Sequence, residues 1–256
     1  SEMDLKNKRI ILTGASSGIG RALAKKLSKE SCRLALLSRR VDLLNELREE
    51  IKSESCEVYT HYCDISDKQS VKEAFDYAKS VLGEIDVAIF NAGYGQPTAI
   101  ENFNSTIAEE TFKTNSLGLV YCVEQVLPDF MKKRGGMIVG TSSLADNRGY
   151  SGSGFYCASK AAATIFLEGL RIDAKKYNIK VLTVKPGFVR TPMTDKNKFT
   201  MPFLMKPERA AEFILNGIKK EKRIIQFPPL TAFGSKLIGL MPSGLYEFLS
   251  ALKKLE

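Results

Sequence analysis

Tyr156 and Lys160 are the pair of side chains in this sequence with the clearest capacity for chemistry. They stand four residues apart at the start of a helical pattern, so they share one helix face. A free tyrosine has a pKa of about 10, and a neighbouring ammonium group lowers it by favouring the phenolate. The spacing predicts a tyrosine that exchanges a proton near neutral pH, although in isolation it is more often a surface pair.

Ser143, upstream of this pair, strengthens the interpretation. It ends the β-rich run Met-Ile-Val-Gly-Thr-Ser-Ser. Side chains that follow a parallel strand gather at the carboxyl edge of its sheet, which is where ligands bind in open α/β folds. Ser143, Tyr156 and Lys160 are therefore candidates for one catalytic site at that edge.

A glycine-rich turn is the second feature that could do chemistry. The run Lys-Arg-Ile-Ile-Leu-Thr continues into residues 14–20, Gly-Ala-Ser-Ser-Gly-Ile-Gly, and a helical pattern follows. Such a turn lets backbone amides at a helix N-terminus face a pyrophosphate. Gly14 would permit the tight turn, Gly18 would let the backbone approach the pyrophosphate closely, and Gly20 would let the helix pack closely on the sheet. Such glycines can be purely structural, and their spacing differs from the GxGxxG of the standard dinucleotide-binding fingerprint. Their place in the first βα unit nevertheless favours a dinucleotide site.

The end of the next strand indicates which dinucleotide. An NAD site would place an acid there to hold the ribose 2′-hydroxyl, but the strand ends in Ser38, Arg39 and Arg40. The planar guanidinium of Arg39 suits a 2′-phosphate. We therefore predict NADP(H), the alternative being that Arg39 is a surface residue at a helix start.

The elements that must position these residues follow from alternating apolar patterns. Seven β-rich runs cover 8–13, 33–37, 57–62, 86–90, 137–141, 180–185 and 223–227, with helical patterns between most of them. Apolar strands alternating with helices are typical of a parallel sheet covered on both faces. We predict one domain over 1–256 with a doubly wound, Rossmann-type α/β fold and a mostly parallel seven-stranded sheet.

Capping residues and a proline predict two helix boundaries. Ser66 with Gln69, and Thr106 with Glu109, have the spacing of capping boxes at the starts of two helices. Pro128 is expected to bend or end the second helix, because it lacks a backbone N–H.

Composition excludes several functional classes. Lys and Arg number 38 against 29 Asp and Glu, a net charge of +9, but the charges are interspersed and favour a solvated basic surface over a nucleic-acid site. His61 is the only histidine and no GxSxG elbow is present, so a His-rich metal site and a Ser-His-Asp hydrolase are not expected. Five cysteines without a CxxC pair, and no secretory apolar stretch at the start, predict reduced thiols in a cytoplasmic protein.

Taken together, these motifs closely resemble the classical short-chain dehydrogenase/reductase family. The resemblance covers roughly 8–195, in the family's order. Its motifs are TGASSGIG at 13–20, Asp64-Ile65, Asn91-Ala92-Gly93, Asn115, Ser143, YCASK at 156–160, and Pro186-Gly187 followed by Thr191. Phe90 and Ser17 depart from it, replacing an asparagine and a basic residue that many members carry there.

The resemblance implies roles for residues that spacing alone does not explain. Asp64 would hold the adenine amino group, Ile65 would pack on its ring, and Asn91 would support the central strands. The segment after the sixth strand would cradle the nicotinamide. The residues expected to contact the cofactor are Gly14, Ser16, Ser17, Gly18, Ile19, Gly20, Ser38, Arg39, Arg40, Asp64, Ile65, Asn91, Ala92, Gly93, Tyr156, Lys160, Pro186, Gly187, Val189 and Thr191.

The resemblance also implies a mechanism. Hydride would pass between the nicotinamide and a carbonyl carbon while Tyr156 donates a proton to the oxygen, to which Ser143 donates a hydrogen bond. Lys160 would lower the pKa of Tyr156 and bind the nicotinamide ribose. Asn115 would hold a water that links Lys160 to solvent, or else bond only within its own helical turn.

The remaining segments bear on specificity and assembly. Residues 188–206, which include Met193, Phe199, Met201, Phe203 and Met205, suit an apolar substrate lid or ordinary local packing. Residues 228–256 are expected to form a helical cap, split near 242–244, that covers the substrate mouth, another subunit or a membrane surface. The wide apolar arc of 155–174 predicts a homodimer or homotetramer.

Three functional hypotheses stay open at this point. The favoured one is reduction of a hydrophobic ketone or aldehyde, or oxidation of the corresponding alcohol. Alternatives are 3-oxoacyl-carrier-protein reduction and a non-catalytic NADP-binding scaffold. Tyr94, Tyr150 and Phe155 are expected to form apolar walls of the substrate pocket.

Overall fold

The computed structural model of the protein describes residues 2–196 and 201–252. Its centre is a seven-stranded sheet in the order β3-β2-β1-β4-β5-β6-β7, in which every neighbouring pair is parallel. The strands are β1 (Arg9–Thr13), β2 (Arg33–Ser38), β3 (Val58–Tyr62), β4 (Val87–Phe90), β5 (Met137–Thr141), β6 (Lys180–Pro186) and β7 (Ile224–Phe227). Each of the seven β-rich runs matches one of these strands to within one residue at either end, so the predicted α/β architecture is confirmed.

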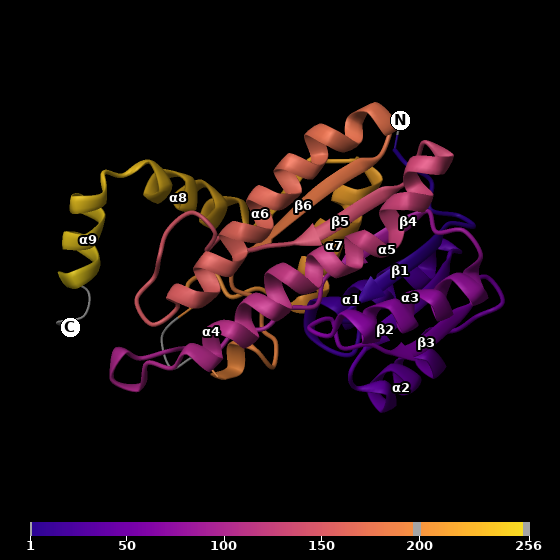
Figure 1. Ribbon diagram of the computed structural model, residues 1–256, viewed down its shortest axis with the longest axis horizontal. Helices are drawn as coiled ribbons and strands as arrows, with labels where there is room; N and C mark the ends of the chain where they lie inside the picture. Colours follow the sequence, from indigo (N-terminus) through magenta and orange to yellow (C-terminus); the bar gives the residue numbers. More distant parts are fainter. Residues whose placement is uncertain (1, 197–200, 253–256) are drawn as a thin grey trace.

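Helices cover both faces of the sheet (Figure 1). They are α1 (Gly18–Leu27), α2 (Val41–Ile51), α3 (Lys68–Leu82), α4 (Ser105–Phe112), α5 (Gly118–Lys133), α6 (Gly154–Ala174), α7 (Pro207–Lys219), α8 (Pro229–Leu240) and α9 (Ser243–Leu252). Helices α1, α2 and α7 pack with Ile10 and Leu12 on one face. Helices α3, α5 and α6 pack with Ile11 on the other, since successive strand side chains alternate in direction.

The start of α3 differs from the prediction by one residue. Asp67, not Ser66, is the N-cap, and its carboxylate accepts from the backbone amides of Gln69 and Ser70. Ser66 instead donates its hydroxyl to Asp64. The Ser66–Gln69 capping box is therefore wrong, because an adjacent carboxylate satisfies two free amides where a hydroxyl would satisfy one.

The second capping box is also wrong. Asn104 caps α4 by accepting from the amide of Thr106. The N-cap therefore lies two residues before Thr106, the cap that the Thr106–Glu109 spacing predicted. Pro128 lies inside α5, which continues to Lys133. Pro128 therefore does not end the helix.

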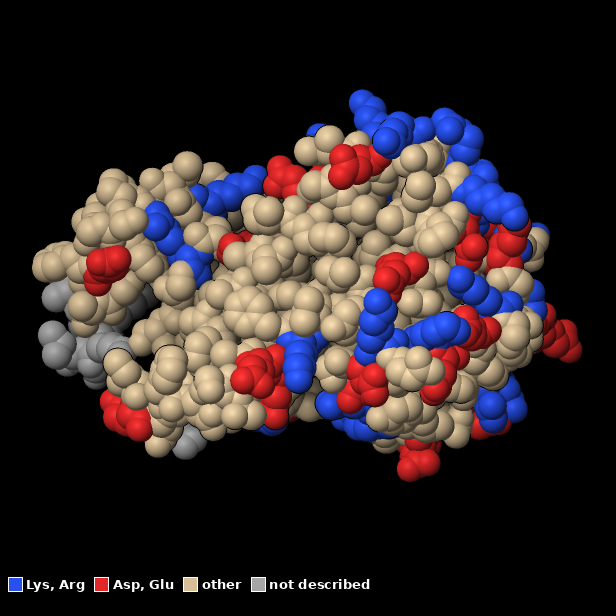
Figure 2. All heavy atoms as spheres, viewed as in Figure 1, with Lys and Arg blue, Asp and Glu red and all other residues tan. Residues whose placement is uncertain are grey.

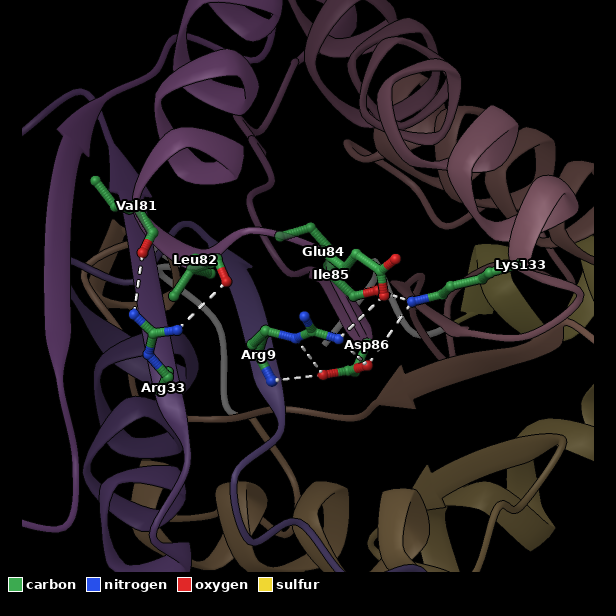
Figure 3. A network of polar contacts seen from close by, with 8 residues as sticks. All are labelled: Arg9, Arg33, Val81, Leu82, Glu84, Ile85, Asp86 and Lys133. Carbon is green, nitrogen blue, oxygen red and sulfur yellow. Dashed lines mark hydrogen bonds and ion pairs between the residues drawn. The ribbon is translucent and has the colours of Figure 1, made fainter.

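A cluster of charged groups joins three elements at the amino edge of the sheet (Figure 3). The Asp86 carboxylate, just before β4, accepts from the backbone amide, Nε and Nη2 of Arg9 at 2.9–3.0 Å. Lys133 at the end of α5 lies 3.7 Å from the same carboxylate. Burial raises the pKa of Asp86, but the hydrogen bonds and charges of Arg9 and Lys133 outweigh it and hold the pKa below its usual value.

Asp86→Asn is expected to lower the free energy of unfolding by about 2–3 kcal/mol at pH 7, the scale for hydrogen bonds to a charged group. Because folding lowers the pKa of Asp86, its contribution is complete above the unfolded pKa of about 3.9 and is lost as the pH falls through the folded value. Urea unfolding followed by circular dichroism, at pH 7 and at steps below pH 5, measures this loss.

Glu84→Gln is the matched control for this prediction. Glu84 also contacts Arg9, but its side chain is mostly exposed, so its loss should cost under about 0.5 kcal/mol. Equal destabilisation by the two substitutions, or a difference from wild type that does not shrink in acid, would contradict the role given to Asp86.

The two C-terminal helices form an arm that extends from one end of the molecule (Figure 1). Asn147 Nδ2 donates to the carbonyl of Ser235 on α8, at 2.6 Å, and Tyr246 on α9 donates its hydroxyl to the Gly149 carbonyl, at 2.8 Å. The break between α8, which ends at Leu240, and α9, which begins at Ser243, lies close to the predicted position at 242–244. Within 2–196 and 201–252, no helix is both long enough and apolar enough to cross a membrane.

Candidate active site

A cavity of about 370 Å³ opens at the carboxyl edge of the sheet. It is lined by the turn after β1, the ends of β2 and β4, the segments after β3 and β6, and the first turns of α6. All of the predicted cofactor contacts except Gly20 line it. Further lining residues that the sequence analysis did not assign to the cofactor are Cys63, Tyr94, Thr114, Thr141, Ser142, Pro192, Met193 and Thr194. The fold thus brings the predicted set together, and contact with a cofactor stays a prediction.

The glycine turn has the conformation and the space that its sequence predicts. Gly14 and Gly18 have φ of +68° and +53°, a region that side chains disfavour. A Cβ on Gly14 would lie 2.7 Å from the Ala92 backbone, and one on Gly18 would lie 2.8 Å from Thr191. A Cβ on Gly20 would collide with the Gly14 carbonyl oxygen at 2.1 Å. Gly20 therefore packs the helix against the turn itself and lies behind the cavity wall.

Two polar side chains hold this turn against β4. Asn91 Nδ2 donates to the Gly14 carbonyl at 3.3 Å. Thr13 Oγ1, at the end of β1, accepts from the amides of Asn91 and Ala92 at 3.1 and 3.3 Å. The supporting role expected of Asn91 between the central strands agrees with these contacts.

The basic end of the cavity contains two arginines in different settings. Arg39 is 68% exposed, and its Nη1 lies 3.9 Å from the Asp64 carboxylate. Arg40 reaches back to the glycine turn, where its Nε and Nη2 donate to Ser16 Oγ at 3.1 and 2.9 Å and Nη2 also donates to Ser17. The sequence placed most weight on Arg39, whereas the structure adds Arg40 as a direct link between the strand end and the turn.

Lys160 is a buried residue of the cavity lining. Its Nζ donates to the Thr141 carbonyl at 3.0 Å and lies 5.8 Å from the centre of the Tyr156 ring. Burial lowers the pKa of Lys160 to about 8, and the negative charge of Asp146 opposes this shift. The ammonium group is thus close to its titration point at neutral pH.

Tyr156 has a pKa above its ordinary value in this structure. Burial raises the pKa of its hydroxyl, and a hydrogen bond with Ser143 acts in the opposite direction. Burial is the largest of these effects, so the net shift of the Tyr156 pKa is upward, whereas a downward shift was expected from Lys160. Ser143 is buried, lies next to Tyr156 and does not line the cavity.

Asn115 lies in a π-helical turn, Lys113–Leu117, between α4 and α5. Its Nδ2 donates to the Tyr94 carbonyl at 2.7 Å and to Ser159 Oγ at 3.0 Å, and its Oδ1 accepts from the Tyr94 amide at 2.8 Å. The alternative that Asn115 bonds only within its own turn is thus wrong. A Cβ on Gly93 would lie 3.3 Å from Lys160 Nζ and 3.4 Å from Asn115 Oδ1, so both groups approach the chain at that glycine.

The two ends of the predicted lid, 188–206, pair with each other after β6. The amides of Arg190 and Met205 donate to the carbonyls of Met205 and Phe188, both at 2.9 Å, which pairs the two ends of the segment. Near its start, the Met193 sulfur and the Tyr156 ring both lie about 3.3 Å from a Cβ built on Gly95. Phe199 lies outside the described residues.

The three aromatic walls expected of the pocket are placed differently. Tyr94 lines the cavity, and its hydroxyl donates to Gln96 and Glu110 at 2.6 and 3.1 Å. Phe155 packs edge-on against Phe103, with ring centres 5.4 Å apart, and Tyr150 packs against Tyr246 of α9. Phe155 and Tyr150 do not line the cavity. Phe155 instead contacts the segment before α4, and Tyr150 contacts α9.

Comparisons with known proteins agree with this geometry. Residues 8–201 match the family described as short chain dehydrogenase. An uncharacterized oxidoreductase of Myxococcus xanthus is 31% identical over 95% of this chain and 96% of its own. The NADP-dependent 3-hydroxy acid dehydrogenase of Schizosaccharomyces pombe is 31% identical over 86% and 90%. The alcohol dehydrogenase of Thermococcus sibiricus, solved with 5-hydroxy-NADP, has a TM-score of 0.77 and 27% identity over 86% of this chain and 94% of its own.

Proposed function

The chain belongs to the short-chain dehydrogenase family, and from this we propose that it transfers hydride between NADP(H) and a carbonyl or secondary-alcohol group. The observation that carries the proposal is one cavity lined by the glycine turn, Arg39 and Arg40 at one end and by Tyr156 and Lys160 at the other. A dinucleotide needs both an anion-binding end and a reactive end within one cleft.

The residues present fit such a cofactor. Gly14 and Gly18 line the cavity where a Cβ would clash with Ala92 or Thr191, and the turn leads into the first amides of α1, which suit a pyrophosphate. Arg39 and Arg40 supply positive charge where the adenosine end would lie. When bound, NADPH supplies the hydride, and the protein supplies binding, orientation and proton transfer.

The proton chemistry falls to three side chains. In the reductive direction, the Tyr156 hydroxyl gives its proton to the substrate oxygen as negative charge develops there, and Ser143 donates a hydrogen bond to the same oxygen. The raised pKa of Tyr156 favours the protonated form that this step requires. Lys160, with a pKa of about 8, stabilises the phenolate that remains.

The preference for NADP(H) over NAD(H) rests on the end of β2. No carboxylate stands there to accept from a ribose 2′-hydroxyl, whereas two guanidinium groups stand beside Ser16, Ser17 and Ser38. The Schizosaccharomyces pombe relative is NADP-dependent by its name, which supports the same assignment.

A hydrophobic ketone or aldehyde is the proposed substrate class. Met193 borders Tyr156, and its flexible thioether suits apolar groups of varied shape. The cap formed by α8 and α9 is proposed to shield the same entrance, since its anchor segment, 147–150, follows Ser143 closely. Because that yeast relative is named for 3-hydroxy acids, their 3-oxo counterparts are a second candidate class.

NADPH oxidation measured across ketones, aldehydes and 3-oxo esters of graded size tests the proposal. We expect turnover that rises with the apolar size of the substrate and is much weaker with NADH. NADPH binding without turnover of any carbonyl would favour the non-catalytic scaffold. Selective turnover of 3-oxoacyl thioesters would favour the carrier-protein alternative.

Self-association is proposed through α5 and α6. Ile165 and Ile172 are 67% and 72% exposed on α6, and Val120 on α5 and Leu117 directly before it are also exposed. Figure 2 shows a largely uncharged band of surface over these helices. Light scattering at micromolar concentration should give at least a dimer, and Ile165→Asp with Ile172→Asp should give a monomer. A monomeric wild-type protein would contradict this interface.

A further inference from the structure

Asp146 lies inside a polar network that the proposed chemistry does not use. Its side chain is 4% exposed, and its Oδ2 lies 2.7 Å from Lys185 Nζ. Thr164 donates its hydroxyl to the same carboxylate oxygen. The Thr164 hydroxyl also lies 2.7 Å from Ser142 Oγ, which donates to the Lys160 carbonyl at 2.8 Å.

The network around Asp146 includes residues from α6, from β6 and from the segment directly after β5. Ser142 directly precedes Ser143 at the end of β5. Thr164 follows Lys160 by one turn of α6, so that it lies on the same helix face as Tyr156. Lys185 directly precedes Pro186, where β6 leads into the segment that borders the cavity.

We propose that Asp146 is a positioning residue of the active site, whose buried carboxylate holds the ends of β5 and β6 to α6 and thereby sets the geometry and charge around Tyr156 and Lys160. The inference rests on the proposed function, because it concerns the proton transfer at Tyr156. A buried carboxylate with an ion pair and a hydroxyl donor is costly to disturb, so it fixes the elements that supply its partners.

The charge of Asp146 reaches both reactive groups. Burial lowers the pKa of Lys160 and Asp146 raises it, whereas burial raises the pKa of Tyr156 and Asp146 raises it further. Cys157 also raises the pKa of Tyr156. Lys185 from β6 and Lys236 from α8 line a hollow of about 410 Å³ together with Asp146. Tyr150 is also within reach of the Asp146 charge.

This arrangement gives opposite expectations for the two members of the ion pair. Asp146→Asn removes a negative charge and leaves Lys185 unpaired, so the pKa values of Tyr156 and Lys160 should both fall. Lys185→Gln leaves the carboxylate uncompensated, so both pKa values should rise. Carbonyl reduction requires protonated Tyr156 and is lost as the pH rises through that pKa.

The test is the pH dependence of kcat for carbonyl reduction at saturating NADPH. The alkaline limb of this profile, where kcat falls as the pH rises, should move to lower pH by about 0.5–1 unit in Asp146→Asn. It should move to higher pH by a similar amount in Lys185→Gln. The double variant should return close to the wild-type limb. Thr164→Val, which removes a hydroxyl and no charge, should lower kcat about 3–10-fold without moving the limb.

A second readout does not depend on turnover. With ¹³Cζ-labelled tyrosine, the Tyr156 resonance, assigned through Tyr156→Phe, should titrate at lower pH in Asp146→Asn and at higher pH in Lys185→Gln. Asp76→Asn, in the exposed Lys72–Asp76 pair on α3, is the matched control and should move neither readout. Limbs and resonances that stay in place, or that move in the same direction in both variants, would overturn the role of Asp146. A wild-type protein that reduces no carbonyl would overturn the proposed function instead.

Discussion

Tyr156→Phe is expected to lower kcat for carbonyl reduction by ~10²–10⁴-fold, the usual scale for removal of a general acid. The substitution removes the hydroxyl that supplies the proton and keeps the ring that packs near Gly95 and Met193. The Kd for NADPH, measured by cofactor fluorescence, should therefore change little. The measurement is initial-rate NADPH oxidation with the best substrate of the carbonyl screen.

A matched substitution separates this effect from the general loss of a tyrosine hydroxyl. The hydroxyl of Tyr59 donates to Glu57 on the exposed side of β3, far along the sheet order from β5. Tyr59→Phe should keep kcat within about twofold of wild type, since an exposed hydrogen bond contributes little. If Tyr156→Phe also stayed within that range while both variants melted at the wild-type temperature, Tyr156 would not be the proton donor.

Arg39→Ala is expected to weaken NADPH binding by ~10–100-fold, which corresponds to the loss of one charge-assisted contact with a phosphate. NADH, which has no 2′-phosphate, should bind within about twofold of its wild-type affinity. Titration of both cofactors by fluorescence measures the ratio. Equal weakening of the two would show that the 2′-phosphate does not lie at Arg39.

Arg40→Ala provides a comparison with a different expected pattern. Arg40 donates to Ser16 and Ser17, so its removal should loosen the glycine turn and weaken NADH as well as NADPH. Arg48→Ala, which removes an exposed partner of Glu49 on α2, is the control and should affect neither cofactor. A pattern for Arg40→Ala identical to that of Arg39→Ala would mean that Arg40 contacts only the phosphate.

The strands were predictable because their burial is simple. Ile10, Ile11 and Leu12 are buried in turn on opposite faces, so a short continuous apolar run sufficed to identify β1. Helix boundaries were less predictable, because Ser66 and Asp67 are adjacent residues that can both cap a helix. Which of the two caps α3 depends on contacts such as the hydrogen bond from Ser66 to Asp64, and such contacts form only in the folded chain.

The site was predictable where its residues are close in sequence or share a motif. The glycine turn and the Tyr156–Lys160 pair are of this kind. The ion pair of Asp146 with Lys185 was not predictable, because it joins the segment after β5 to the end of β6, and the two side chains meet only once the chain has folded. A downward shift of the Tyr156 pKa was expected from the charge of Lys160, but burial, which sequence does not quantify, is the largest effect and the net shift is upward.

The π-helical turn at Lys113–Leu117 has a consequence for how this chain can change its length. A π turn contains one residue more than the α-helical turn it replaces, and it is less favourable than regular helix. Deletion of one residue there would let α4 and α5 join as a continuous α-helix, while Asn115 would lose the local geometry that directs its amide to Tyr94 and Ser159. Under the proposed function, a chain shortened at this turn would gain regular helix and lose the placement of Asn115, so stability and catalysis would make opposite demands on the length of this turn.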